Sequence, residues 1–198
     1  GGSYIGDGNP FTEVPLGSNW DDDGHGTHCS GIMCVLGDND KGIAGVAWKK
    51  TKLISYQSLG FDKGDSAWAV YGALADLTNT VEILRKNPAS RTPTDKAKLP
   101  SYIRNKDFQI TQKTVPVNMS LGGSIGSEFA LEVLTHALMH DVLPVIAMGN
   151  EGRYTAAYPA AFPGVLAVGA TNGKDKKARF SNSGAWISVA APGESIIS

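Results

Sequence analysis

Apolar segments of strand length and of helix length alternate along this chain. Two segments repeat apolar residues with the spacing of a helix: 66–85 and 127–140. Five shorter apolar runs are typical of buried strands: 53–56, 115–120, 142–148, 165–168 and 186–190. Because such alternation builds parallel sheets, the sequence predicts an α/β fold with three layers, α/β/α, and a mainly parallel central sheet. Ligands of such sheets bind beyond the carboxyl ends of the strands.

Composition narrows the class of partner. The chain has 198 residues, a hydrophobic content of 41% and a net charge of −1, as expected for a globular domain with its own core. Without a strong positive charge or a long apolar run, we expect no nucleic-acid partner and no membrane segment. The chain begins with Gly1. We therefore interpret it as a processed or excised piece of a longer polypeptide.

Three glycine-containing motifs follow one another along the chain. Residues 25–28 read HGTH, residues 118–123 read NMSLGG, and residues 147–152 read AMGNEG. In this order they resemble the histidine, substrate-strand and oxyanion motifs of the subtilisin-like serine proteases. Four further segments continue the resemblance: 158–159, 162–165, 180–181 and 191–193.

The resemblance implies two catalytic residues. His25 would be the general base that takes a proton from a serine hydroxyl and returns it to the leaving amine. Asn150 would donate its side-chain amide to the oxyanion of the tetrahedral intermediate. The aspartate and serine motifs of the family do not occur in residues 1–198. We therefore expect this chain to be the central portion of a peptidase domain, incomplete at both ends, inactive alone and marginally stable.

The resemblance also implies where a peptide substrate would bind. An extended peptide would pair, through its main chain, with an open edge formed by Ser120, Leu121 and Gly122. The opposite edge would lie around Gly64, and Leu59 would line the neighbouring side-chain pocket. The predicted ligand is therefore a protein or peptide in extended conformation.

The same resemblance places the primary specificity pocket next to the oxyanion motif. Its wall would run from Ala147 through Gly149 to Asn150, and its floor would lie near Ala157. This lining is small and apolar, so we expect an apolar substrate side chain of medium or large size. Glu151 at the rim would add tolerance for Lys or Arg.

Several residues around His25 have both a structural and a functional interpretation. The acidic run 21–23 is either a solvated loop or a determinant of basic substrate residues. Cys29 and Cys34 should not pair with each other, because they point about 140° apart on a helix. They are either small buried hydrophobes or, for Cys29, a thiol close to the catalytic imidazole. His28, one turn beyond His25, is assigned to packing and hydrogen bonding.

Two segments contain residues of the types that bind metal ions. His136 and His140 have a spacing that suits a metal, but no carboxylate lies between them, so a structural role is preferred. Residues 36–43 resemble the calcium loop that follows the histidine helix in the family. A structural calcium is possible there, and a polar turn is the alternative. No cofactor is required for the chemistry.

Residues 87–113 interrupt the alternation with three prolines and many charged residues. We interpret this stretch as an inserted, mobile surface loop within a single partial domain, 1–198. The sequence as a whole predicts part of a secreted or cell-surface serine endopeptidase that works through an acyl-enzyme. The remaining segments of its own polypeptide would be further partners. The alternative is a noncatalytic peptide-binding module or pseudoprotease that keeps the substrate-binding surface.

Overall fold

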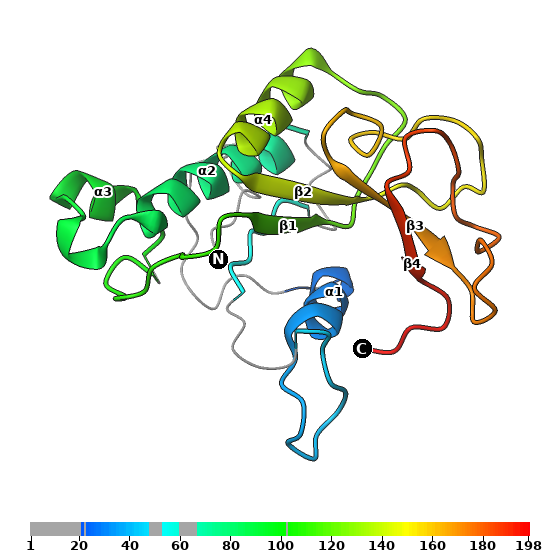
Figure 1. Ribbon diagram of the computed structural model, residues 1–198, viewed down its shortest axis with the longest axis horizontal. Helices are drawn as coiled ribbons and strands as arrows, with labels where there is room; N and C mark the ends of the chain where they lie inside the picture. Colours follow the sequence, from blue (N-terminus) through cyan, green and yellow to red (C-terminus); the bar gives the residue numbers. More distant parts are fainter. Residues whose placement is uncertain (1–20, 22, 48–52, 60–66, 102) are drawn as a thin grey trace. The chain divides into compact units, whose positions relative to one another are not determined.

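The computed structural model describes residues 21, 23–47, 53–59, 67–101 and 103–198. The chain forms two compact units (Figure 1). The first contains residues 1–73, 92–106 and 197–198, and the second contains residues 74–91 and 107–196. Each unit is described by itself below. No helix in the described part of the chain is long and apolar enough to cross a bilayer.

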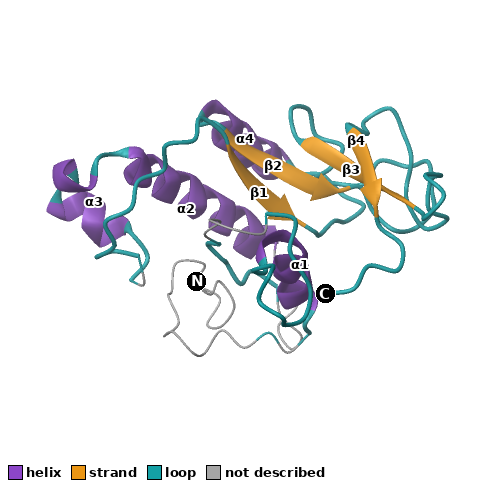
Figure 2. Cartoon of the chain, turned by 60° about the horizontal axis from the view of Figure 1, so that its bottom comes forward, coloured by secondary structure: helices purple, strands orange, loops and turns teal. Residues whose placement is uncertain are grey.

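A parallel sheet forms the centre of the second unit (Figure 2). Its strands are β1 (Val115–Met119), β2 (Val142–Ala147), β3 (Leu166–Thr171) and β4 (Val189–Pro192). They lie side by side in sequence order, and every neighbouring pair is parallel. The α/β class with a parallel sheet, predicted from the alternation of apolar segments, is therefore confirmed.

Helix α4 (Glu128–Met139) connects β1 to β2 and packs against β2. The helix begins where Ser127 accepts a hydrogen bond from the backbone of Ala130, so that a serine satisfies one of the free N–H groups of the first turn. Its buried face contains Ala130, Leu134 and Ala137, all predicted from the helical spacing. The helix boundaries match the prediction to within one residue at each end.

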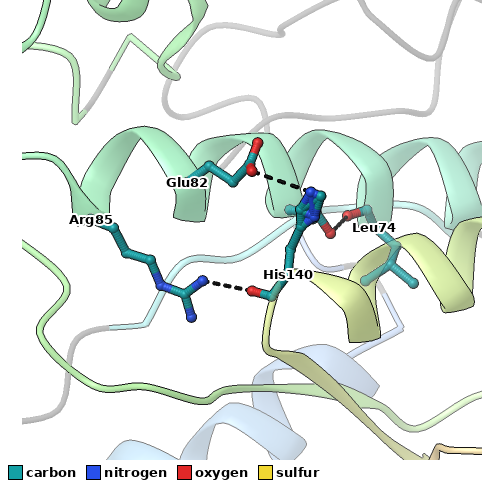
Figure 3. A network of polar contacts seen from close by, with 5 residues as sticks. Leu74, Glu82, Arg85 and His140 are labelled. Carbon is teal, nitrogen blue, oxygen red and sulfur yellow. Dashed lines mark hydrogen bonds and ion pairs between the residues drawn. The ribbon is translucent and has the colours of Figure 1, made fainter.

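Helix α2 (Ala67–Arg85) also follows its predicted apolar pattern. The apolar residues that repeat with helical spacing in segment 66–85 are buried: Val70, Leu74, Leu77, Val81 and Leu84. Polar contacts then fix the end of this helix (Figure 3). Arg85 donates hydrogen bonds to the carbonyls of His140 and Lys113, and Glu82 lies 3.3 Å from Nε2 of His140. The helix end is thereby held beside the start of β2.

Residues 87–113 are more ordered than an irregular loop. They contain the short 3-10 helix η1 (Pro88–Ser90) in the second unit and α3 (Pro93–Lys98) in the first. Thr92 and Asp95 form a reciprocal capping box at the start of α3. Leu99 and Ile103 are buried. The expected mobile loop is thus partly helical, while its status as an insertion within one domain stays a prediction.

Three predicted strands need correction. Residues 53–56 are not a strand, and in this stretch only Gln57 forms an isolated bridge. The run predicted at 165–168 lies at 166–171, and the run predicted at 186–190 lies at 189–192. A short apolar run shows that a segment is buried, but hydrogen bonds from a neighbouring strand decide where a strand begins and ends.

Candidate active site

His25 is the first residue of α1 (His25–Cys34), and it is exposed. Gly24, which precedes it, has a φ of 80°, a conformation that glycine adopts without strain. Asp21 holds this turn through its carboxylate. It accepts hydrogen bonds from the backbone of Gly24 at 2.9 Å and from both the backbone and the hydroxyl of Thr27 at 2.6 Å. These bonds fix the start of the helix that carries His25.

The hydrogen bonds lower the pKa of Asp21 below its ordinary value, and the Thr27 hydroxyl is the largest cause. Asp21 is thus an anchor for α1, a role that neither interpretation of the acidic run had assigned to it. Asp23 is exposed, and Asp22 lies outside the described residues.

Three more residues of α1 have a predicted role: His28, Cys29 and Cys34. Sγ of Cys29 lies 3.7 Å from Nε2 of His25, which matches the interpretation of Cys29 as a thiol close to that imidazole. Cys29 and Cys34 are both free thiols and only partly buried, so neither forms a disulfide. His28 contributes its backbone N–H to the carbonyl of Gly24, and its own carbonyl accepts a hydrogen bond from Ser198.

Asn150 lies at the carboxyl end of β2, in the loop that follows Ala147. Gly149 and Gly152 bracket this loop with φ values of 98° and 66°. The Asn150 side chain is exposed. The loop therefore presents an amide donor at the strand end where parallel sheets bind their ligands.

Asn182 lies outside every motif predicted from the sequence. Its side chain is 2% exposed and forms hydrogen bonds with the backbone of Glu151 and Arg153, the residues that follow Asn150. Asn182 comes directly after the segment 180–181, but 31 residues separate it from Glu151 in the chain. Local sequence pattern does not reveal a contact over that distance.

The predicted substrate edge follows β1. Ser120 and Leu121 are partly buried, and Gly122 is exposed. The next residue, Gly123, exchanges two backbone hydrogen bonds with Tyr158, at 2.7 and 2.8 Å. This bridge brings the edge next to Ala157, which is 9% exposed and was predicted as the pocket floor.

The structure places the predicted site residues in two groups. The second unit contains Asn150 with most of the predicted substrate-binding residues: Ser120, Leu121, Gly122, Ala147, Gly149 and Ala157. His25 and the partly buried Leu59 belong to the first unit. Gly64 lies outside the described residues. Glu151 accepts a 2.6 Å hydrogen bond from Asn182, so one of its carboxylate oxygens is already engaged.

The two segments weighed as metal sites show turn and packing contacts. The rings of His136 and His140 are in contact, with centroids 4.3 Å apart and planes tilted by 36°. In residues 36–43, Asp38, Asp40 and Gly42 adopt positive φ, and Asn39 accepts a hydrogen bond from the backbone of Lys41. No three His, Cys, Asp or Glu side chains gather into a metal-binding group within the described residues. A structural calcium in this loop therefore stays a prediction, since backbone and Asn carbonyl oxygens also bind Ca²⁺.

Comparisons with known proteins identify relatives of this chain. The family model described as "Subtilase family" matches residues 7–198. Thermitase from Thermoactinomyces vulgaris is 30% identical over 175 residues, which cover 88% of this chain and 51% of thermitase. Subtilisin E from Bacillus subtilis is 30% identical over 190 residues, covering 92% of this chain and 41% of that protein. The chain thus spans about half the length of these relatives, or less.

Solved structures show the same fold. A protease from Pseudoalteromonas arctica PAMC 21717 superimposes with a TM-score of 0.59 at 26% identity, over 84% of this chain and 42% of that one. A psychrophilic protease superimposes with a TM-score of 0.64 at 23% identity, over 84% of this chain and 51% of its own length.

Proposed function

Because this chain belongs to the subtilase family, we propose that its full-length protein is a serine endopeptidase. It would cleave peptide bonds through an acyl-enzyme. His25 is assigned the role of general base, which takes the proton of the serine hydroxyl and then protonates the leaving amine. Asn150 is assigned the role of oxyanion donor. A substrate peptide would pair with the edge at Ser120–Gly122 and place an apolar side chain beside Ala147, Gly149 and Ala157.

The observation that best supports this proposal is the loop around Asn150. An exposed amide follows directly from the carboxyl end of a central parallel strand, on a loop bracketed by two glycines with positive φ. Such a fixed donor stabilises charge that develops only in the transition state.

Three narrower proposals follow from the same premise. The stretch 1–198 alone should lack peptidase activity, because no serine in it lies in a nucleophile motif of the Gly-Thr-Ser type. The full-length protein is proposed to act outside the cell or at its surface. This proposal is supported by a relative from Dichelobacter nodosus that is named "Extracellular basic protease". A calcium ion near residues 36–43 would be held partly by carbonyl oxygens, because no three His, Cys, Asp or Glu side chains gather within the described residues. No step of the chemistry uses it.

The test combines covalent labelling with kinetics of the full-length protein. The unaltered protein should react with a serine-directed fluorophosphonate and hydrolyse a chromogenic peptide, and the stretch 1–198 should do neither. His25→Ala should abolish turnover. Asn150→Ala should lower kcat about 100- to 1000-fold with little change in KM, the range already known for the asparagine of subtilisin.

His28→Ala is the matched control from the same helix, and it should lower the melting temperature more than kcat. The full-length protein could instead bind the peptide without hydrolysing it and without reacting with the fluorophosphonate. That result would identify a noncatalytic peptide-binding protein. Near-normal turnover in His25→Ala would refute the assignment of the base.

A further inference from the structure

Asn182 is a buried amide whose side chain uses all of its hydrogen-bonding capacity on one loop. Its Nδ2 group donates to the carbonyl of Met148 at 3.1 Å and to the carboxylate of Glu151 at 2.6 Å. Its Oδ1 accepts from the backbone of Glu151 at 3.2 Å and from that of Arg153 at 2.9 Å. An amide has two donors and two acceptor sites, so all four are engaged.

The backbone around Asn182 strengthens the same attachment. The N–H of Asn182 donates to the carbonyl of Gly149, and the N–H of Gly152 donates to the carbonyl of Phe180. The N–H of Ser183 donates to the carbonyl of Arg153. Residues 149–153 are therefore attached to residues 180–183 on both sides of Asn150, whose own side chain stays exposed.

The segment that carries Asn182 is itself held in place. The Ser181 hydroxyl accepts a hydrogen bond from the backbone of Ala170, in β3, and donates to the carbonyl of Asn182. Lys177 donates to the carbonyl of Ser181 at 2.8 Å. The amide of Asn182 thus connects the loop of Asn150 to a central strand of the sheet.

We propose that Asn182 is the positioning residue of the oxyanion donor, holding the loop of Asn150 so that its amide meets the developing negative charge. This inference rests on the proposed peptidase function and adds a residue to it. An oxyanion donor acts only if it already lies in place, and a displacement of about 1 Å can cost about 100-fold in rate. Asn182 touches no reacting atom and acts through Asn150.

The sharpest variant is Asn182→Asp in the full-length protein. It keeps the size of the side chain but replaces the donor group by an oxygen that faces the carbonyl of Met148 and the carboxylate of Glu151. Because both neighbours are acceptors, the loop should move. We expect kcat to fall about 10- to 100-fold, with KM changed less than about 2-fold. Asn182→Ser, which introduces no charge, replaces this variant if Asn182→Asp does not fold.

Glu151→Gln provides a rescue. The introduced amide can donate to the carboxylate of Asn182→Asp, so the double variant should regain part of the lost kcat. The control is Asn172→Ala, since Asn172 holds a turn in the same way, accepting hydrogen bonds from the backbones of Lys174 and Lys176. That control should lower the melting temperature and leave kcat unchanged.

A double-mutant cycle separates positioning from general stability. If Asn182 acts through Asn150, Asn182→Asp should have little further effect on kcat once Asn150→Ala is present. Two results would overturn the inference and leave the peptidase function standing. In the first, the effects of Asn182→Asp and Asn150→Ala on kcat multiply in the double variant. In the second, Asn182→Asp has a normal kcat while Asn150→Ala is impaired. An unaltered protein without activity, or an Asn150→Ala variant with normal kcat, would overturn the proposed function and this inference with it.

Discussion

Gly149 shows how one residue can depend on another that is far away in the sequence. Its φ of 98° already disfavours any side chain. A Cβ atom at this position would also lie 2.3 Å from Nδ2 of Asn182 and 2.7 Å from a carboxylate oxygen of Glu151. Position 149 therefore requires glycine for two reasons: the positive φ, and the lack of space for a Cβ atom beside the Asn182 amide.

We expect Gly149→Ala to lower both stability and activity. The positive φ alone costs about 1–3 kcal/mol for a residue with a side chain, and displacing Asn182 adds to that cost. Thermal unfolding and steady-state kinetics of the full-length protein would measure the two effects. Gly173→Ala is the matched control, because a Cβ there has no atom within 4 Å among its described surroundings. Equal behaviour of the two variants would contradict the crowding seen at Gly149.

Helix α1 is stabilised at its start by a residue that lies outside the helix. It begins with His25, has no acidic residue in its first turn and receives no side-chain cap from Gly24. Asp21 replaces that missing cap by accepting the N–H of Thr27, one of the groups left free at a helix start. The ionised carboxylate also lies near the positive end of the helix dipole, which favours it further.

The stability contributed by Asp21 should depend on pH. Its pKa is lower in the folded state than the ordinary value of 3.8, so its contribution is complete above that value and is lost as the pH falls through the lowered pKa. Asp21→Asn keeps only one of the two accepting oxygens, so it should lower the free energy of unfolding near neutral pH, by less than the about 0.5–2 kcal/mol of a complete cap loss. The difference from the unaltered protein should shrink in acid.

Chemical denaturation of the full-length protein over a pH series would measure this difference. Asp23→Asn is the control, since Asp23 is a neighbouring exposed acid and no hydrogen bond of its side chain is seen within the described residues. A constant difference between Asp21→Asn and the unaltered protein down to pH 2 would argue against the carboxylate as the anchor.

At the scale of the whole molecule, the chain consists of two compact units. Several large apolar side chains are exposed in them, among them Val46 at 87%, Ile125 at 86% and Met139 at 79%. The relatives that the chain matches are about twice as long or longer. We therefore expect further protein to cover part of this apolar surface in a complete domain.

We therefore expect residues 1–198, expressed alone, to be marginally stable. Calorimetry should give a broad transition at a lower temperature than the full-length protein, and an apolar dye should bind in the absence of denaturant. Adding the missing segments as a separate chain should sharpen the transition. A sharp, cooperative transition of a monomer that binds no dye would contradict this expectation.

The sequence by itself determined helices α2 and α4, the parallel sheet and the family motifs, because these depend on local periodicity and on short runs of residues. The buried residues of α2 and α4 are examples, since they repeat with the spacing of a helix. Tertiary structure alone decided what holds the site residues. The bonds of Asn182 to Glu151 and Arg153 join segments far apart in the chain, and Asp21 acts through three bonds that only a folded turn assembles. Residue type and spacing show which groups a chain contains, whereas long-range packing fixes which of them meet.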